Sequence, residues 1–201
     1  MPRQPRVVIA GQPHHIIQRG NNRQNIFNAP RDYYYFLNKL YETSIEYDCD
    51  IHAYVLMTNH THMLVTPKTQ DNLIKMMRKL GTCYAHYFNY NYERTGSLFE
   101  GRYKSSTISD DAYFFICMRY IELNPVRAYM VKHPSNYEWS SYHANALGKK
   151  NTIISPHYLY LSMAKNKDER NKLYENLFTL ALSDKDIKKI QSSCKKSIPL
   201  L

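Results

Sequence analysis

Short runs of apolar, β-prone residues alternate in this chain with longer segments whose apolar residues recur three and four positions apart. Helical spacing of this kind puts the apolar residues on one face of an α-helix. The short runs are bounded by Gly, Asn, Pro or Asp, which is typical of strands. This pattern predicts strands at about residues 14–19, 51–57, 60–65 and 103–108, and helices at about 32–47, 71–90 and 111–123.

The order of these elements is β-α-β-β-α-β, followed by a further helix. The link of residues 58–59 is short enough for a tight hairpin, whereas the other strands are joined through helices. We therefore predict an α+β fold, a ferredoxin-like (RRM-like) βαββαβ sheet with a further helix following and a C-terminal helical extension. A chain of 201 residues is long enough to bury one good hydrophobic core.

Two histidines, His60 and His62, lie two residues apart in the second strand of the predicted hairpin. Alternate residues of a strand share a face, so the two imidazoles should project side by side. Imidazole is a common ligand of divalent metals, and two neighbours make half of a metal site. The alternative interpretation is that one or both histidines simply pack and hydrogen-bond in the core.

The last predicted helix carries a second pair of candidate residues, Tyr120 and Asn124. They are four residues apart and therefore lie on one face, one turn from each other. Tyr120 is a potential nucleophile and Asn124 a potential neutral oxygen ligand. Pro125 lacks the N–H that a helix would direct to Ile121, so the helix should kink or end there. With 19 tyrosines in the chain, Tyr120 alone could equally be a packing residue.

Three sequence blocks, in this order, resemble the single-tyrosine transposases of the HUH superfamily. The closer resemblance is to the branch associated with repetitive extragenic palindromes, the REP-associated tyrosine transposases (RAYTs). The blocks are His60-Thr61-His62 before an apolar strand, Gly101-Arg102-Tyr103-Lys104-Ser105, and Tyr120-Ile121-Glu122-Leu123-Asn124-Pro125-Val126-Arg127. The resemblance extends over about residues 13–147 and includes Trp139-Ser140-Ser141-Tyr142 near its end.

This resemblance implies a metal-dependent endonuclease and strand-transferase that acts on single-stranded, hairpin or palindromic DNA through a covalent 5′-phosphotyrosine. Tyr120 would be the nucleophile, and His60, His62 and Asn124 would hold a divalent ion, Mg²⁺ or Mn²⁺. Two imidazoles suit Mn²⁺ better than the harder Mg²⁺. The wider family includes monomers and homodimers, and the sequence leaves both states open.

Composition agrees with a polyanionic partner. The net charge is +10, with 27 Lys and Arg against 17 Asp and Glu. An anionic membrane surface is the alternative. We find neither a long apolar run nor a signal-peptide pattern, so insertion into a membrane and secretion are not expected. The four cysteines are scattered without metal-binding spacing and are expected to be reduced thiols, so we predict a cytoplasmic protein.

Several basic residues lie in or beside the matched blocks or follow the first strand, where they could contact DNA phosphates. For each of them a solvated charge or an ion pair is equally compatible with the sequence. The candidates are Arg19, Arg23, Arg102, Lys104, Arg119 and Arg127.

Two other classes of function are compatible with parts of the pattern. A non-catalytic protein of ferredoxin-like fold could bind structured nucleic acid, but its strands lack the aromatic RNP consensus. A zinc-dependent hydrolase could use the two histidines, but the chain has no HExxH motif. We therefore favour the transposase-like nuclease.

Composition shifts after Gly148, so we predict a catalytic domain at residues 1–148 and a basic helical extension at 149–201. The extension holds 11 Lys or Arg against 5 Asp or Glu, which is +6 of the total +10. Helices are predicted at residues 165–182 and 184–191. The lysines of the extension could face DNA, or the helices could dock on the core and leave the lysines in solvent.

Overall fold

The computed structural model describes residues 7–200; residues 1–6 and residue 201, the outer ends of the two predicted domains, lie outside this described part. Four strands form one sheet in the order β2-β3-β1-β4, and every neighbouring pair is antiparallel. The strands are β1 His14–Arg19, β2 Cys49–Met57, β3 His60–Pro67 and β4 Lys104–Thr107. This is the ferredoxin-like topology that the sequence predicted.

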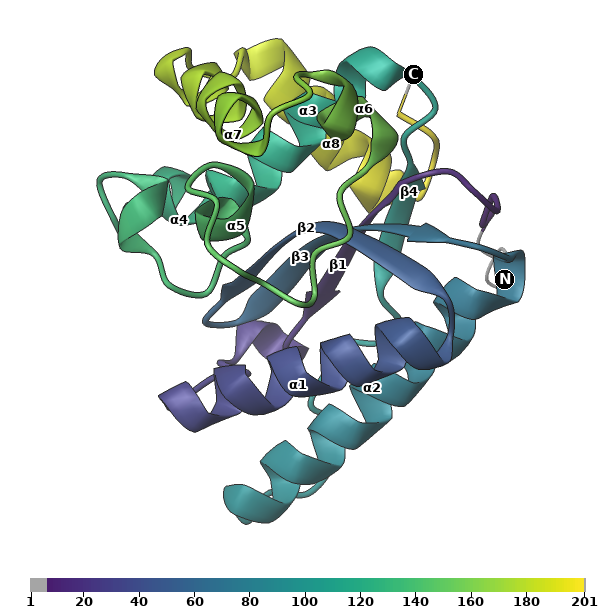
Figure 1. Ribbon diagram of the computed structural model, residues 1–201. Coiled ribbons are helices and arrows are strands. Elements are labelled where there is room, and N and C mark those ends of the chain that lie inside the picture. The colour runs from purple at the N-terminus through teal and green to yellow at the C-terminus, as the bar shows by residue number, and fades with distance from the viewer. Residues whose placement is uncertain (1–6, 201) are drawn as a thin grey trace.

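Helices cover both faces of the sheet. On one face lie α1 (Pro30–Glu46) and α2 (Gln70–Asn91), and on the other lie α3 (Asp111–Glu122) and the helices of the C-terminal part (Figure 1). Each face packs into its own hydrophobic cluster, with Ile16 and Met63 in the first and Val55 and Leu64 in the second. Most residues of the inner strands β1 and β3 are therefore buried, polar ones included, because neither face is open to water.

The hairpin between β2 and β3 turns at Thr58-Asn59, with Met57 opposite His60. Along β3, the residues that follow His60 and His62 on the same face include Leu64, which belongs to the cluster beneath α3. Both histidines therefore belong to the face of the sheet that α3 covers. The predicted tight hairpin and the shared face of the two imidazoles are confirmed.

Helix α3 begins after Asp110, whose side chain accepts from the backbone N–H of Ala112. It ends at Glu122, and a short helix, α4 (Asn124–Arg127), follows after Leu123. The break falls where the sequence predicted it, because Pro125 has no N–H to donate to the Ile121 carbonyl. Asn124 replaces that donor, since its Nδ2 lies 2.8 Å from the Tyr120 carbonyl and 3.3 Å from that of Ile121.

A buried carboxyl group ties α3 to the helices around it. Glu122 is fully buried and accepts hydrogen bonds from Ser141 Oγ at 2.5 Å, Asn145 Nδ2 at 2.8 Å and the Tyr174 hydroxyl at 2.8 Å. Burial raises the pKa of Glu122 to about 7, against the opposing effect of these donors. The contacts fix the C-terminal end of α3, where Tyr120 and Asn124 lie.

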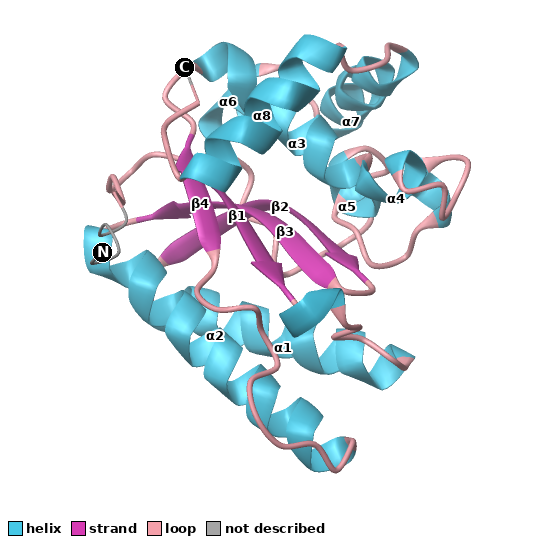
Figure 2. Cartoon of the chain, turned by 180° about the vertical axis from the view of Figure 1, so that it is seen from behind, coloured by secondary structure: helices cyan, strands magenta, loops and turns pink. Residues whose placement is uncertain are grey.

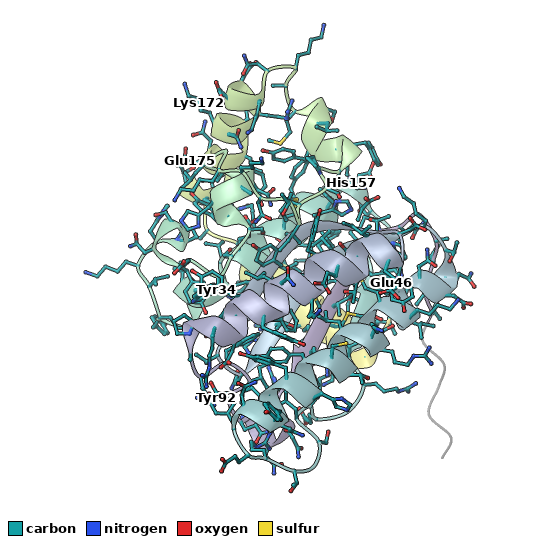
Figure 3. The ribbon with its side chains drawn as sticks, turned by 60° about the horizontal axis from the view of Figure 1, so that its bottom comes forward. Tyr34, Glu46, Tyr92, His157, Lys172 and Glu175 are labelled. Carbon is teal, nitrogen blue, oxygen red and sulfur yellow. The ribbon has the colours of Figure 1, made fainter. Side chains whose placement is uncertain are left out.

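The C-terminal part packs against the sheet as a set of short helices and one longer one. α8 lies beside β4 and also contacts β1 and α3 (Figure 2), and Leu200 pairs with Ile108 next to β4. Figure 3 shows Lys172 and Glu175 on α7, at the opposite end of the molecule from Tyr92. The α-helices of this part are α5 Tyr142–Asn145, α6 Tyr158–Ser162, α7 Lys167–Asn176 and α8 Asp184–Lys196, and the 3-10 helices of the chain are Asn21–Arg23, Pro134–Asn136 and Leu177–Thr179.

The two helices predicted in the extension differ in length from those observed. The first ends at Asn176 and closes with a 3-10 turn, because Ser183 starts a new helix by accepting from the N–H of Asp186. The second continues to Lys196 because Ile190 and Cys194 are buried on its inner side. The division of the chain at residue 148 stays a prediction. None of the helices within residues 7–200 is long and apolar enough to cross a membrane.

Candidate active site

One cavity of about 620 Å³ brings together most of the residues singled out from the sequence. It lies at the ends of β1 and β3, between the sheet, the α3–α4 junction and α8. Its lining includes both histidines, the tyrosine and the asparagine of the predicted site together with five of the six basic candidates. The residues are Ile17, Gln18, Arg19, Arg23, Met57, His60, His62, Glu100, Gly101, Arg102, Lys104, Tyr120, Asn124, Arg127, Ala128, Gln191 and Lys195.

The two histidines of β3 lie next to each other, with ring centroids 5.0 Å apart and ring planes at 73°. Nδ1 of His60 is 2.6 Å from Oδ1 of Asn59, whose Nδ2 in turn donates to the Arg23 carbonyl at 3.1 Å. Because Oδ1 only accepts, His60 carries its proton on Nδ1, which leaves Nε2 with a free lone pair. Nε2 of His60 is therefore available as a ligand.

Burial keeps both imidazoles uncharged. It lowers the pKa of His60 to about 4, and the charge of Arg19 contributes. For His62, burial and then the neighbouring histidines lower the pKa well below the usual value of 6.5. Since a histidine binds metal in its neutral form, these environments favour metal binding near neutral pH.

Tyr120 reaches the same place from α3. Its ring is edge-on to the ring of His62, with centroids 5.8 Å apart and planes at 74°. The guanidinium of Arg127 lies over the tyrosine ring, 4.7 Å from its centroid. The side chain is only 4% exposed, and it lines the cavity. The tyrosine therefore stands beside the two histidines and under a positive charge.

The amide of Asn124 has a fixed orientation. Its Nδ2 is held by the Tyr120 and Ile121 carbonyls, so Oδ1 is the atom left to bind something in the cavity. Two imidazole nitrogens and one amide oxygen fit a divalent ion that keeps open positions. Within residues 7–200 no cluster of three or more His, Cys, Asp or Glu is arranged to hold a metal. His60 and His62 therefore need Asn124 as the third ligand of a metal site.

Basic residues surround this set on several sides. Arg19 ends β1 directly opposite His60 in β3, and Lys104 begins β4 opposite Ile17. The loop that carries Arg102 is held by a hydrogen bond from Gln18 Nε2 to the Gly101 carbonyl at 3.2 Å. The cavity is therefore positively charged along its rim, which suits phosphate groups.

Arg119 is the one basic candidate that the structure does not bring to the cavity. It donates to the Leu180 carbonyl, and its guanidinium lies over the Phe178 ring at 5.9 Å. Burial lowers the pKa of Arg119 from its usual range. Its contacts hold the extension to α3, so a contact with DNA in the cavity is not supported for this residue.

Three residues near the site were missed from the sequence. His15 of β1 is fully buried, and its Nε2 lies 2.9 Å from Nδ1 of His62; burial lowers its pKa to about 3. The predicted ferredoxin-like topology puts the first strand beside the third, but it does not give the register that brings His15 next to His62. Gln191 and Lys195 of α8 line the cavity, and nothing local in the sequence indicated it.

Comparisons with known proteins bear on the family and the fold of this chain. The family model described as "Transposase IS200 like" matches residues 10–124. A solved structure, a REP-associated tyrosine transposase bound to a REP hairpin, has a TM-score of 0.64 at 18% identity, covering 78% of this chain and 93% of its own. A second, a candidate transposase from Deinococcus radiodurans, has a TM-score of 0.42 at 14% identity, covering 67% and 97%. No curated protein matches the chain.

Proposed function

This chain belongs to the IS200-like transposase family, whose model matches more than half of its length, and on that premise we propose that it is a nuclease and strand-transferase. It acts on single-stranded DNA next to hairpin or palindromic sequences, as a member of the REP-associated branch. Its chemistry is that of the HUH superfamily, with Tyr120 as the nucleophile and a divalent ion as cofactor.

One observation carries this proposal. Tyr120, Asn124 and the pair His60 and His62 come from different elements and line one basic cavity. Structural packing alone gives no reason for a tyrosine, an amide oxygen and two imidazole nitrogens to line the same cavity. A protein that only bound nucleic acid would need the basic rim, but not the uncharged histidines behind it.

The fit of the metal rests on the hydrogen bonds around its ligands. His60 presents Nε2 because Asn59 occupies its Nδ1, and Asn124 presents Oδ1 because backbone carbonyls occupy its Nδ2. A divalent ion, Mg²⁺ or Mn²⁺, held by His60, His62 and Asn124 would supply positive charge that stabilises the phosphate during attack. Side chains of the protein carry out the nucleophilic attack and hold the DNA.

Tyr120 attacks the phosphorus of a phosphodiester through its hydroxyl oxygen. The Oη–P bond forms as the P–O3′ bond breaks, the phenol loses its proton, and the departing 3′ oxygen takes a proton to become a hydroxyl. The 5′ side of the break stays attached to Tyr120 as a phosphotyrosine. Because this ester keeps the energy of the broken bond, a 3′ hydroxyl can reverse the step and rejoin a strand without a nucleotide cofactor.

Arg127 has two tasks in this scheme. From its place over the Tyr120 ring it stabilises negative charge as the phenol attacks, and it keeps the ring turned toward the cavity. Arg19, Arg23, Arg102 and Lys104 hold the phosphates of the strand along the rim. The similar structure at 18% identity is bound to a REP hairpin, which supports a hairpin as the substrate of this chain.

The test is a covalent-adduct assay with an end-labelled single strand that carries a hairpin, in the presence of Mn²⁺ or Mg²⁺. We expect the labelled 5′-phosphoryl side of the break to migrate with the denatured protein. Tyr120→Phe should abolish the adduct, because it removes only the attacking oxygen. Tyr113→Phe is the matched control: Tyr113 lies on the same helix but outside the cavity, where its hydroxyl contacts Lys189.

An adduct that persists in Tyr120→Phe would assign the nucleophile to another residue. Tight hairpin binding with no adduct in the unmodified protein would favour the non-catalytic nucleic-acid binder instead. Loss of the adduct in both the Tyr120 and Tyr113 variants would point to a structural cause.

A further inference from the structure

A hydrogen-bonded chain runs from His62 in the candidate site to helix α8. It passes from His62 Nδ1 to His15 Nε2 at 2.9 Å, and from His15 Nδ1 to Cys194 Sγ at 3.3 Å. All three side chains are buried, with at most 3% exposed. None of them is needed by the proposed reaction except His62, so the other two require an explanation.

The geometry between the two rings is that of a directed hydrogen bond. Their planes differ by only 16°, while their centroids are 5.1 Å apart. Rings stacked face to face come closer, as Tyr35 and Tyr87 do at 3.8 Å. The imidazoles of His15 and His62 therefore meet edge to edge, with one N–H pointing at the lone pair of the other ring.

The contacts of the thiol at the far end fit the following order of donors. Cys194 donates its S–H to the backbone carbonyl of His15, 3.5 Å away, so its sulfur is left as an acceptor. His15 then carries its proton on Nδ1 and accepts at Nε2. His62 must be the donor, with its proton on Nδ1, and its Nε2 keeps a free lone pair. The opposite order would put a proton on His62 Nε2 and prevent that nitrogen from binding a metal.

We propose that His15 is a positioning residue that fixes the tautomer and ring orientation of His62, and that Cys194 of α8 holds His15 in the accepting form. His15 does for His62 what Asn59 does for His60, so both histidines present Nε2. Neither ring changes its charge in this scheme; only the placement of one proton is at issue. The assignment rests on the proposed function insofar as Nε2 is taken to face a metal.

A consequence concerns the extension. Helix α8 places Cys194 against β1 and also brings Gln191 and Lys195 to the cavity. The C-terminal extension then helps to position a ligand of the proposed metal site, so it is not structurally independent of the catalytic part. Hydrogen bonds to the second nitrogen of a ligating histidine change metal affinity by about 10–100-fold.

The first measurement uses the unmodified full chain without metal or DNA. Nitrogen-15 NMR of the imidazole rings reports which nitrogen carries the proton in each histidine. We expect His62 and His60 as Nδ1–H tautomers and His15 as an Nδ1–H tautomer that accepts at Nε2. A His62 ring protonated on Nε2 overturns the proposal without any variant having to fold.

The second measurement is Mn²⁺ affinity, followed by the loss of the free-ion EPR signal. His15→Leu removes the acceptor and should weaken Mn²⁺ binding about 10–100-fold. His15→Gln can place an amide oxygen near the position of Nε2 and should recover most of the affinity. His157→Leu is the matched control: it removes a buried histidine that packs on Phe114, outside the cavity lining.

Equal Mn²⁺ affinity in His15→Leu and the unmodified protein overturns the proposal, and so does an equal loss in His15→Leu and His157→Leu. Cys194→Ala should shift His15 toward a mixture of tautomers, whereas Cys194→Ser should keep the Nδ1–H form. Failure of the proposed function is separate from these results. A protein that forms no DNA adduct but shows the expected tautomers and metal affinities would retain the role of His15 and lose the nuclease.

Discussion

The side chain of Asn124 donates to the backbone carbonyl of Tyr120, one turn earlier on the same helix, at 2.8 Å. This bond couples a proposed metal ligand directly to the proposed nucleophile. A second, longer bond from the same nitrogen reaches the Ile121 carbonyl, whose usual partner is missing because residue 125 is a proline. Asn124 therefore has a structural task in addition to its proposed chemical one.

The two tasks of Asn124 can be separated by a double-mutant cycle. Asn124→Ala should lower the free energy of unfolding by about 1–3 kcal/mol, because a buried carbonyl loses its donor. Pro125→Ala in that background returns a backbone N–H to the Ile121 carbonyl and should recover part of the loss. Urea unfolding of the four proteins measures the coupling.

Adduct formation should respond differently from stability in the same cycle. It should be lost in Asn124→Ala and stay lost in the double variant, because the backbone N–H cannot replace the amide oxygen as a ligand. If Pro125→Ala restored both stability and adduct formation, the ligand role of Asn124 would be wrong. If it restored neither, the hydrogen-bond account of the helix break would be wrong.

Two arginines near Tyr120 should give opposite results when replaced by glutamine. Arg127→Gln removes the charge over the tyrosine ring, which is worth about 1–2 kcal/mol, and should slow adduct formation roughly tenfold. Arg119→Gln should leave that rate unchanged and lower the melting temperature, because Arg119 holds Leu180 and Phe178 of the C-terminal part. Single-turnover kinetics and thermal unfolding distinguish the two; a rate loss in Arg119→Gln would contradict the structure-based assignment.

The sequence predicted the parts of the site that depend on local geometry. His60 and His62 share a face because strands repeat every two residues, and Tyr120 and Asn124 share one because helices repeat near every four. The same rule shows why Arg119 was a poor candidate, since consecutive helix residues point in different directions. Proximity to Tyr120 in sequence was mistaken for proximity in space.

Other parts depend on long-range packing and could not be read locally. The sequence placed His15 only in a strand. Its role depends on its position as the diagonal neighbour of His62, with His15 on β1 and His62 on β3. Gln191 and Lys195 reach the cavity only because Ile190 and Cys194 bury one side of α8 against the sheet. No property of residues 184–196 alone predicts where that helix docks.

The position of α8 predicts which lysines of the extension contact DNA. Lys195→Ala should reduce single-strand affinity and lower the slope of log affinity against log salt by about 0.7, because Lys195 lines the cavity. Lys165→Ala, an exposed lysine outside the cavity lining, should leave the slope unchanged. Salt titrations of the three proteins make the comparison. Equal slopes in all three would mean that Lys195 does not contact DNA.

We expect His52 to make the free energy of unfolding depend on pH, with lower stability in mild acid. His52 is buried, with Nδ1 at 2.7 Å from the Ser155 carbonyl and Nε2 at 2.8 Å from Thr66 Oγ1. Burial lowers its pKa to about 4, from 6.5, against the opposing effect of the Ser155 carbonyl. Between these values His52 binds a proton in the unfolded chain but not in the folded chain, so its contribution to the free energy of unfolding decreases as pH falls from 6.5 to 4.

A shift from 6.5 to about 4 corresponds to about 3 kcal/mol of stability present at neutral pH and lost by pH 4. His52→Asn keeps a donor for Ser155 but cannot titrate, so its deficit relative to the unmodified protein should shrink by about that amount on acidification. Thr66→Val keeps the imidazole and should lower stability while the pH dependence persists. Urea unfolding at pH 7, 5.5 and 4 measures both. A constant difference between His52→Asn and the unmodified protein would show that His52 does not drive the acid sensitivity.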